Sequence, residues 1–252
     1  MKSNDLKKIL NELENDLNLI NPELREWNQI YFRNQKNRYI PDLETIKKWY
    51  NGGKILEMGS VPCHFTYILK KMGLAVTGLD IDPNRSKQFI EKHKLDVIKC
   101  DIEKDKIPFK NNSFDLVIFN EILEHLRIDP IFALKEVNRV LKPNKNMILT
   151  TPNLYSIINI SSFLMGKSIN DAYDEFDKIH TLGHAGHVRE FSSNEVKRFL
   201  KNTGFEVIEA KFINYDYEEY GYLGSSLSRF LKIFSRINPR WRDMQVIISK
   251  KL

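Results

Sequence analysis

Short apolar runs alternate with helix-length segments between residues 54 and 150, and this rhythm restricts the fold more than any other feature of the chain. The runs that predict strands are 54–58, 74–79, 96–99, 114–119 and 146–150. The segments that predict helices between them include 63–72, 84–93 and 130–141. Parallel strands require crossover connections, and these are right-handed. We therefore predict an α/β fold whose parallel sheet is covered by helices on both faces.

The chain after residue 150 predicts two more strands, which gives a Rossmann-like, doubly wound sheet of seven strands. The predicted elements are helix 193–202, strand 205–213, helix 224–236 and strand 243–249. Residues 153–190 interrupt the rhythm and contain three of the six histidines. Ligands of doubly wound sheets bind at the carboxyl ends of the strands. We expect 153–190 to be an insertion after the fifth strand that lies over this crevice.

Residues 1–50 predict helices. Leu6, Leu10, Leu13 and Leu17 recur at spacings of four and three, which places them on one helical face. Asn51, Gly52 and Gly53 then break the pattern. We expect 1–50 to form a helical extension or lid and 51–252 to form the main domain.

The composition is that of an ordinary globular protein. Hydrophobic residues make up 42% and charged residues 29%, and the net charge is +6. Two cysteines are too few for a disulfide framework, and no apolar run approaches the roughly 18 residues of a membrane span. The N-terminus lacks the apolar segment of a signal peptide. These features predict a soluble, cytoplasmic protein.

The segment KILEMGSVPCHF predicts a strand, a turn and a helix. Gly59 at the turn would let the backbone approach a ligand where a Cβ atom would collide. A dinucleotide-binding turn needs three glycines, but Val61 and Cys63 occupy the other two positions. The pattern therefore disfavours NAD and FAD, whose pyrophosphate sits at the helix N-terminus, and favours a cofactor without a pyrophosphate.

Two acidic residues follow the next two predicted strands. Asp80 lies 21 positions beyond Gly59, close to the spacing of about 20 that is typical of a ribose-binding carboxylate. The alternative is a solvated aspartate that caps the helix after Pro83, a role that Asp82 fits better. Asp101 follows the third strand.

The order of these motifs is more diagnostic than any one of them. The segments are LEMGS, GLDIDP, CDIE, IPFKNNSFDLVIFNEILEHL and EVNRVLKPNKNMILTTPN. In this order they resemble the class I S-adenosylmethionine-dependent methyltransferases over about residues 54–210. The resemblance implies an enzyme that uses S-adenosylmethionine. It implies that Glu57 and Gly59 lie under the methionine part of the cofactor, and that Asn120 lines this part and the reacting centre.

The resemblance also implies the residues around the nucleoside part of the cofactor. Asp80 would accept from both ribose hydroxyls, and Ile81 would pack on the adenine. Asp101 would accept from the adenine amino group, with Ile102 beside it. At the N-terminal extension we expect Tyr31 and Arg33 to lie nearest the cofactor carboxylate, because they precede the first strand.

A hydroxyl acceptor must lose a proton, which requires a general base or a metal ion. The pattern Glu-x-x-Glu-His, followed by His-x-x-Glu-aromatic-Ser, is similar to metal-assisted O-methyltransferases of the ubiquinone pathway and to small-RNA 2′-O-methyltransferases. The resemblance implies that Glu121, Glu124, His125 and His187 would hold a divalent metal. The alternative is direct proton removal by His125 or His187. The sequence leaves both open.

The acceptor class has three interpretations. TTPN and GHVREFS resemble methyltransferases of polysaccharide and glycolipid gene clusters, which favours O-methylation of a small polar acceptor such as a sugar or a lipid-linked glycan. The alternatives are an RNA methyltransferase, disfavoured because no appended RNA-binding module is visible, and a non-catalytic scaffold with the methyltransferase fold.

Residues 224–237 form a basic amphipathic pattern that permits peripheral membrane contact or, alternatively, packing of a surface helix on the core.

Overall fold

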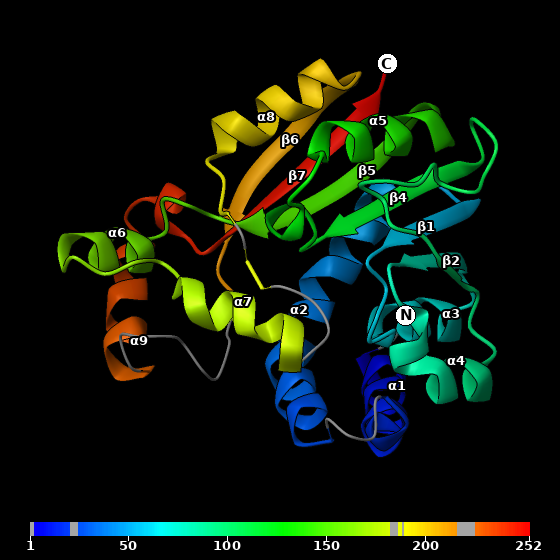
Figure 1. Cartoon of the computed structure of the whole chain (residues 1–252), viewed down its shortest axis with the longest axis horizontal. Coiled ribbons are helices and arrows are strands. Elements are labelled where there is room, and N and C mark those ends of the chain that lie inside the picture. Colours follow the sequence, from blue (N-terminus) through cyan, green and yellow to red (C-terminus); the bar gives the residue numbers. More distant parts are fainter. Residues whose placement is uncertain (1–2, 21–24, 182–185, 188, 216–224) are drawn as a thin grey trace.

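The computed structural model describes residues 3–20, 25–181, 186–187, 189–215 and 225–252, without the side chains of 3–4 and 225–229. Within these residues seven strands form one sheet (Figure 1). The strands are β1 (Lys54–Met58), β2 (Ala75–Asp80), β3 (Val97–Lys99), β4 (Phe114–Asn120), β5 (Leu141–Pro152), β6 (Phe205–Ile213) and β7 (Met244–Lys251). Their order is β3-β2-β1-β4-β5-β7-β6, and β7 is antiparallel to both of its neighbours. The predicted α/β fold with a doubly wound, seven-stranded sheet is confirmed.

Helices connect the strands and cover both faces of the sheet. The α-helices are α1 (Ser3–Asn15), α2 (Arg25–Trp49), α3 (His64–Lys71), α4 (Lys87–His93), α5 (Pro130–Val140), α6 (Ile157–Leu164), α7 (Ala172–Thr181), α8 (Ser193–Asn202) and α9 (Ser225–Phe234). Short 3₁₀ turns are η1 (Leu17–Leu19), η3 (Pro83–Ser86), η4 (Leu123–His125) and η5 (Pro239–Trp241). Most predicted boundaries differ by at most two residues, with two larger differences: the expected helix 84–93 is divided into η3 and α4, and the fifth strand starts five residues earlier than expected.

Alternation along the central strands creates two cores. On β4, Leu116 and Ile118 pack toward α1, α2 and α3, whereas Val117 and Phe119 pack toward α5 and α8. All four side chains are buried because helices cover both faces. A ligand can therefore reach the sheet only at its edges. At the carboxyl ends of the neighbouring strands β1 and β4, the connections leave in opposite directions, toward β2 and toward β5.

The expected helical face near the N-terminus is present. Leu6, Leu13 and Leu17 are buried, and Leu10 packs partly buried against the same core. The face lies against α3. Among the helices that the structure describes, none is both long and apolar enough to cross a membrane.

His64, the first residue of α3, is buried against the long helix α2. Its Nδ1 atom lies 2.9 Å from the Tyr39 hydroxyl, and the Phe32 ring meets it edge-on. Burial lowers the pKa of His64 from 6.5 to about 3. The folded protein therefore holds this imidazole neutral at a pH at which the unfolded chain protonates it.

We predict that His64 makes the protein less stable as the pH falls below about 6.5. One proton taken up on unfolding changes the free energy of unfolding by about 1.4 kcal/mol per pH unit. The His64→Phe variant should lose this dependence, so that its free energy of unfolding falls less than that of the parent between pH 6.5 and 4.5. Urea unfolding at each pH measures both, with exposed His180→Phe as the control. Parallel curves for the parent and His64→Phe would contradict the prediction.

Candidate active site

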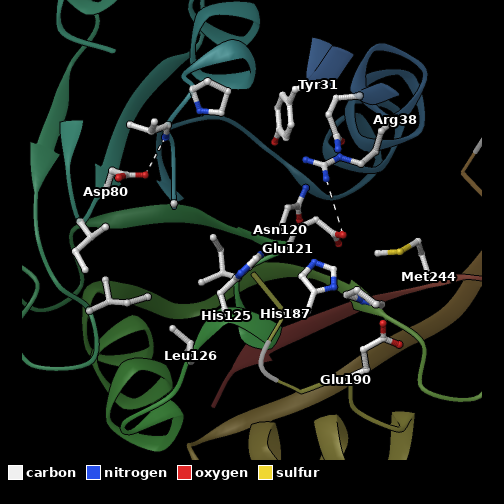
Figure 2. Close-up of a pocket in the computed structure, with 18 of the residues that line it drawn as sticks. Tyr31, Arg38, Asp80, Asn120, Glu121, His125, Leu126, His187, Glu190 and Met244 are labelled. Atoms are coloured by element: carbon white, nitrogen blue, oxygen red, sulfur yellow. Dashed lines mark hydrogen bonds and ion pairs between the residues drawn. The ribbon is translucent and has the colours of Figure 1, made fainter. Parts of the chain in front are cut away.

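A cavity of about 620 Å³ lies at the carboxyl ends of β1, β2 and β4 (Figure 2). Its wall includes Tyr31, Arg38, Gly59, Asp80, Ile81, Asp101, Ile102, Asn120, Glu121, His125, His187 and Glu190. In Figure 2, Asp80 lies on one side and Glu190 on the other, with Asn120 and the two histidines between them. Helix α2, the strand ends and the segment 153–190 therefore contribute to one cavity.

The turn after β1 keeps the tight geometry that the sequence predicts for Gly59. This residue has φ +63°, and a Cβ atom on it would lie 2.0 Å from Cδ1 of Ile122. Cys63, at the position of a missing glycine, is buried and adopts φ +69°. The backbone N–H of Val61 donates to the Asp80 carboxylate at 2.9 Å. The departures from three glycines therefore leave the close approach between this turn and the end of β2 intact.

Asp80 is not a solvated capping residue. It is the last residue of β2, and it is buried in the cavity wall. Its Oδ1 atom accepts from the Asp82 N–H at 2.9 Å and pairs with Arg85 at 3.0 Å. With Val61 on Oδ2, three of about four acceptor positions of the carboxylate are occupied. The carboxylate is thus fixed in orientation and keeps acceptor capacity toward the cavity.

The residues expected around an adenine lie beside Asp80. The side chain of Ile81 is half-exposed at the cavity, and Ile102 lies on the same wall. Asp101 accepts from the Glu103 N–H at 3.1 Å and pairs with Lys104 at 2.9 Å. The structure therefore brings all the proposed nucleoside residues together at one end of the cavity.

The other end of this cofactor region has donors and acceptors suited to an α-amino acid group. The amide Oδ1 of Asn120 and the amide Oε1 of Gln35 are buried and accept no hydrogen bond from the described residues. The Arg38 guanidinium lies on the same wall. Unpaired oxygens can accept from an ammonium group, and a guanidinium binds a carboxylate. The site therefore fits the methionine end of S-adenosylmethionine.

The expectation for Arg33 was wrong, whereas Tyr31 does lie at the cavity. Arg33 is exposed and its Nε atom contacts the backbone oxygen of Gln29. Residues 31, 35 and 38 share one face of α2, because a helix brings i, i+4 and i+7 together. Helical periodicity counted from Tyr31 would have selected Arg38.

Glu57 lies in a small cavity of about 40 Å³ that shares Gly59, Arg38 and Asn120 with the large one. Its carboxyl accepts from Thr66 Oγ1 at 2.6 Å. Burial raises the pKa of Glu57 from 4.5 to about 8. This carboxyl therefore holds its proton near neutral pH and can also donate.

A buried polar network ties α2 to the end of β4. Asp42 accepts from Asn120 Nδ2 at 3.3 Å and from the Tyr215 hydroxyl at 2.9 Å, and it lies 3.5 Å from Arg38 Nε. Arg38 Nη1 lies 3.9 Å from the Glu121 carboxylate. Burial raises the pKa of Asp42. The sequence reasoning missed Asp42. An acidic residue four positions after Arg38 on a predicted helix would have indicated an ion pair between the two.

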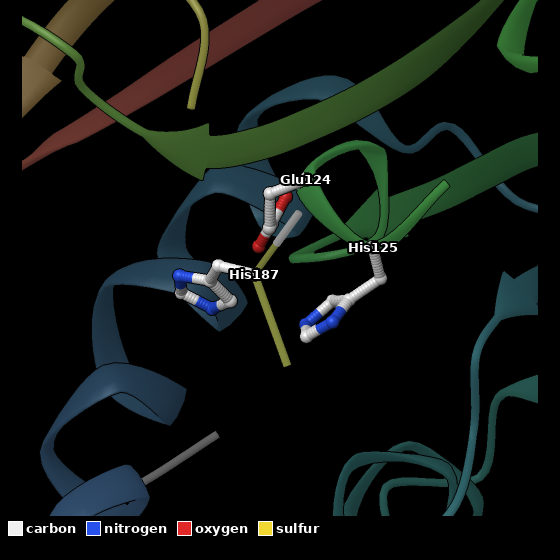
Figure 3. Close-up of side chains that lie close together, drawn as sticks. All are labelled: Glu124, His125 and His187. Atoms are coloured by element: carbon white, nitrogen blue, oxygen red, sulfur yellow. The ribbon is translucent and has the colours of Figure 1, made fainter. Parts of the chain in front are cut away.

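Glu124, His125 and His187 lie close together, with the two histidines on the cavity wall and Glu124 buried beside them (Figure 3). Their candidate ligand atoms lie within 4.8 Å of one another. Glu124 is fully buried and accepts from Thr151 Oγ1 at 2.9 Å, while its Oε1 atom has no hydrogen-bond partner among the described residues. Metal–ligand bonds of about 2.0–2.6 Å separate two ligands by up to about 5 Å. The spacing therefore fits one divalent ion.

The His125 ring is oriented by a backbone carbonyl. Its Nδ1 atom lies 3.0 Å from the Gly186 oxygen, which can only accept. Nδ1 therefore carries the hydrogen, and Nε2 has the lone pair in the neutral ring. The His125 and His187 rings are 4.9 Å apart at 76°.

Helix α7 places His187. The Glu175 backbone oxygen accepts from the Gly186 N–H, and its carboxylate accepts from the His187 N–H at 2.6 Å. A Cβ atom on Gly186 would lie 1.6 Å from the Glu175 carboxylate, so a larger residue here would displace this carboxylate from the His187 N–H. Sequence reasoning missed Glu175, although the glycine before His187 was a signal of close packing.

Glu121 does not join Glu124, His125 and His187. Its carboxylate accepts from Thr150 Oγ1 at 2.8 Å and faces Arg38. The resemblance grouped Glu121 with these three residues, but Glu121 has φ +56° and precedes η4, so no helix aligns it with Glu124. Burial and then the nearby Glu121 charge raise the pKa of Glu124 well above its usual range.

A methyltransferase-domain family model matches residues 56–149. A protein of Methanocaldococcus jannaschii, itself uncharacterized, is 34% identical over 190 residues, which cover 71% of this chain and 72% of that protein. The chain belongs to the class I S-adenosylmethionine-dependent methyltransferases.

Solved methyltransferase structures share the fold. The S-adenosylmethionine-dependent methyltransferase of Archaeoglobus fulgidus aligns with a TM-score of 0.60 and 19% identity, covering 88% of this chain and 99% of its own. That of Thermotoga maritima aligns with a TM-score of 0.60 and 21% identity, covering 93% and 98%. This chain therefore uses S-adenosylmethionine as its cofactor.

We predict that cofactor binding depends on Asp80. A charge-assisted pair with a ribose hydroxyl contributes about 1.5–3 kcal/mol, so Asp80→Ala should weaken S-adenosylmethionine binding by about 10- to 150-fold. Calorimetric titration measures the affinity, and Asp82→Ala serves as the control. A thermal scan confirms that both variants fold. Equal affinities of Asp80→Ala and the parent would remove Asp80 from the cofactor site.

Proposed function

We propose that this methyltransferase transfers a methyl group to a hydroxyl of a small polar acceptor, such as a sugar or a lipid-linked glycan. The observation that carries the proposal is the cluster of Glu124, His125 and His187 beside Asn120. A hydroxyl must lose its proton when the methyl group arrives, and the cluster offers groups that can take or displace it.

The cofactor supplies an activated sulfonium methyl group, so the protein mainly has to position the acceptor. We propose that Glu57, Gly59 and Asn120 hold the methionine end, assisted by Arg38. Asp80, Ile81, Asp101 and Ile102 hold the ribose and adenine. All of these residues except Glu57 line the large cavity, and Glu57 lies in the small cavity that adjoins it; these positions support the roles.

His125 is the proposed base, since Nε2 has the lone pair once Nδ1 donates to Gly186. His187 stands beside it as the second catalytic imidazole. A divalent ion held by Glu124, His125 and His187 is the second way to the same chemistry, because it lowers the pKa of a bound hydroxyl. Glu121 lies outside this metal cluster and is paired with Arg38 instead.

We predict that Glu124→Gln and His187→Gln each weaken Mn²⁺ binding at least about 100-fold, because each removes one of three ligands. Titration of the protein with Mn²⁺ in the presence of S-adenosylhomocysteine measures this. The control is His180→Gln, an exposed histidine on α7 outside the cluster. Absence of Mn²⁺ and Zn²⁺ binding in the parent would leave direct proton removal by His125 or His187.

The acceptor class is tested with tritiated S-adenosylmethionine and a panel of sugars, glycolipids, amines and RNA. Label in a base-stable methyl ether supports the proposal, and His187→Gln should lower its formation while S-adenosylmethionine affinity stays unchanged. Label found only on nitrogen or only on RNA would overturn O-methylation of a small acceptor.

We propose that 1–50 and 153–190 together cover the bound cofactor and acceptor, while 51–252 forms the catalytic domain. Both segments line the cavity, through Tyr31 and Arg38 on one side and through Asn159 and Glu190 on the other. The described residues of these two segments contribute no strand to the sheet. Their contact with the cavity supports a lid role.

We predict that peptides from 25–49 and 157–181 gain protection from hydrogen exchange when S-adenosylmethionine binds, because ordering of a cover suppresses local opening. Mass spectrometry of the exchanged peptides measures the change. Peptides from α8, which packs on the far face of the sheet, are the control. Unchanged exchange in both covering segments would contradict the lid.

Peripheral membrane contact through 224–237 is also proposed, although residue 224 and the side chains of 225–229 lie outside the described residues. Phe230, Ile233 and Ile237 are more than half exposed, which supports contact with an apolar phase. The helix α9 also packs on α6 of the proposed cover.

A further inference from the structure

A second cavity, of about 400 Å³, lies directly beside the catalytic cavity. The two cavities share Ile169, Asn170, His187 and Glu190 as common wall residues. A volume of several hundred cubic ångströms is typical of a small-molecule site. The shared wall makes the second cavity an extension of the catalytic one.

Away from this shared wall, the second cavity combines large apolar side chains with Ser168, Glu175 and Arg189. The two charged groups are already ion-paired, Glu175 with Lys178 and Arg189 with Glu195. Its large apolar side chains are those of Leu154, Phe163, Ile169 and Phe176, which come from α6, from α7 and from the segments before these two helices. Phe163 is 51% exposed and Phe176 is 56% exposed, although both line the cavity. Apolar rings that face an open cavity remain in water until a ligand covers them, and burial of their surface then favours binding.

Polar side chains also line the wall where the two cavities meet. Glu190 Oε2 accepts from Asn159 Nδ2 at 2.7 Å, which fixes the carboxyl at the junction. Asn170 and His187 lie on the same shared wall. A molecule that reaches from the reacting centre into the second cavity thus meets hydrogen-bonding groups first and apolar side chains afterwards.

We propose that the second cavity binds the apolar chain of an amphipathic methyl acceptor, whose polar head lies at Glu190 and Asn170 with its hydroxyl toward His187. This rests on the proposed function, because it places a hydroxyl-bearing head in the catalytic cavity. The junction selects the polar head, and Phe163 and Phe176 select the chain.

The neighbouring elements agree with this occupant. In Figure 1, α6 and α9 lie on the opposite side of the molecule from α3 and α4, and α7 lies between them. Further apolar side chains around the same helices are largely exposed, including Leu164 at 84% and Tyr173 at 77%. An exposed apolar surface around the cavity mouth suits a ligand that is delivered from an apolar phase.

Binding of hexyl, octyl and decyl β-D-glucosides below their micelle concentrations tests the proposal. The protein is loaded with S-adenosylhomocysteine, and calorimetry measures both the loading and the glucoside affinity. Each buried methylene contributes at most about 0.8 kcal/mol, so two more should tighten binding by up to about 15-fold. The expected result is a steady increase along the series.

Phe176→Ser and, independently, Phe163→Ser should flatten this chain-length dependence while S-adenosylhomocysteine affinity is unchanged. Phe230→Ser is the matched control, because Phe230 on α9 has the same exposure of 56% and lines neither cavity. Two variants on different helices guard against a local packing defect in one of them.

Affinity that does not change with chain length would overturn the proposal, and so would an equal loss in Phe230→Ser, which indicates unspecific detergent binding. Either result with intact S-adenosylhomocysteine binding and intact methyl-ether formation leaves the proposed function standing. Loss of methyl-ether formation with every acceptor, despite chain-length-dependent binding, would instead remove the proposed function.

Discussion

The position of the site follows from the burial of both faces of the sheet. Helices cover β4 on both sides, so a polar ligand cannot reach Leu116 to Phe119. Only the carboxyl ends of the strands remain, and the order of the sheet places β1 next to β4 with connections that leave in opposite directions. Gly59, Asp80 and Asn120 come to one cavity because each ends or follows a strand at this edge.

The cavity needs a second wall, which segments outside the sheet provide. Buried Asp42 on α2 joins Asn120, Arg38 and Tyr215, so the long helix is tied to the end of β4. On the opposite side, Glu175 of α7 holds the backbone that carries His187. Polar groups serve as ties here because a buried hydrogen bond is costly to leave unmade and therefore fixes one arrangement.

Burial also determines the charge state of the site. The pKa values of Glu57, Asp42 and Glu124 are all raised, with desolvation as the largest cause, and the pKa of His64 is lowered. Burial thus shifts these three acids and the His64 imidazole toward their neutral forms. A cationic cofactor or a metal ion changes this balance, because a nearby positive charge favours the ionised carboxylates.

The sequence by itself determined the sheet, the turn at Gly59 and the acidic residues at the ends of β2 and β3, because strand periodicity and turn chemistry are local properties. It also identified His125 and His187 through a resemblance. Only the tertiary structure decided which face of α2 meets the cavity, and helical periodicity from Tyr31 then selects Arg38 rather than Arg33. It also decided that Glu121 stays outside the cluster of Glu124, His125 and His187, through a left-handed backbone. It also decided that Glu175 positions His187 and that a second cavity adjoins the first. These contacts join segments separated along the chain or depend on one backbone angle, and no periodic pattern in the residues encodes either.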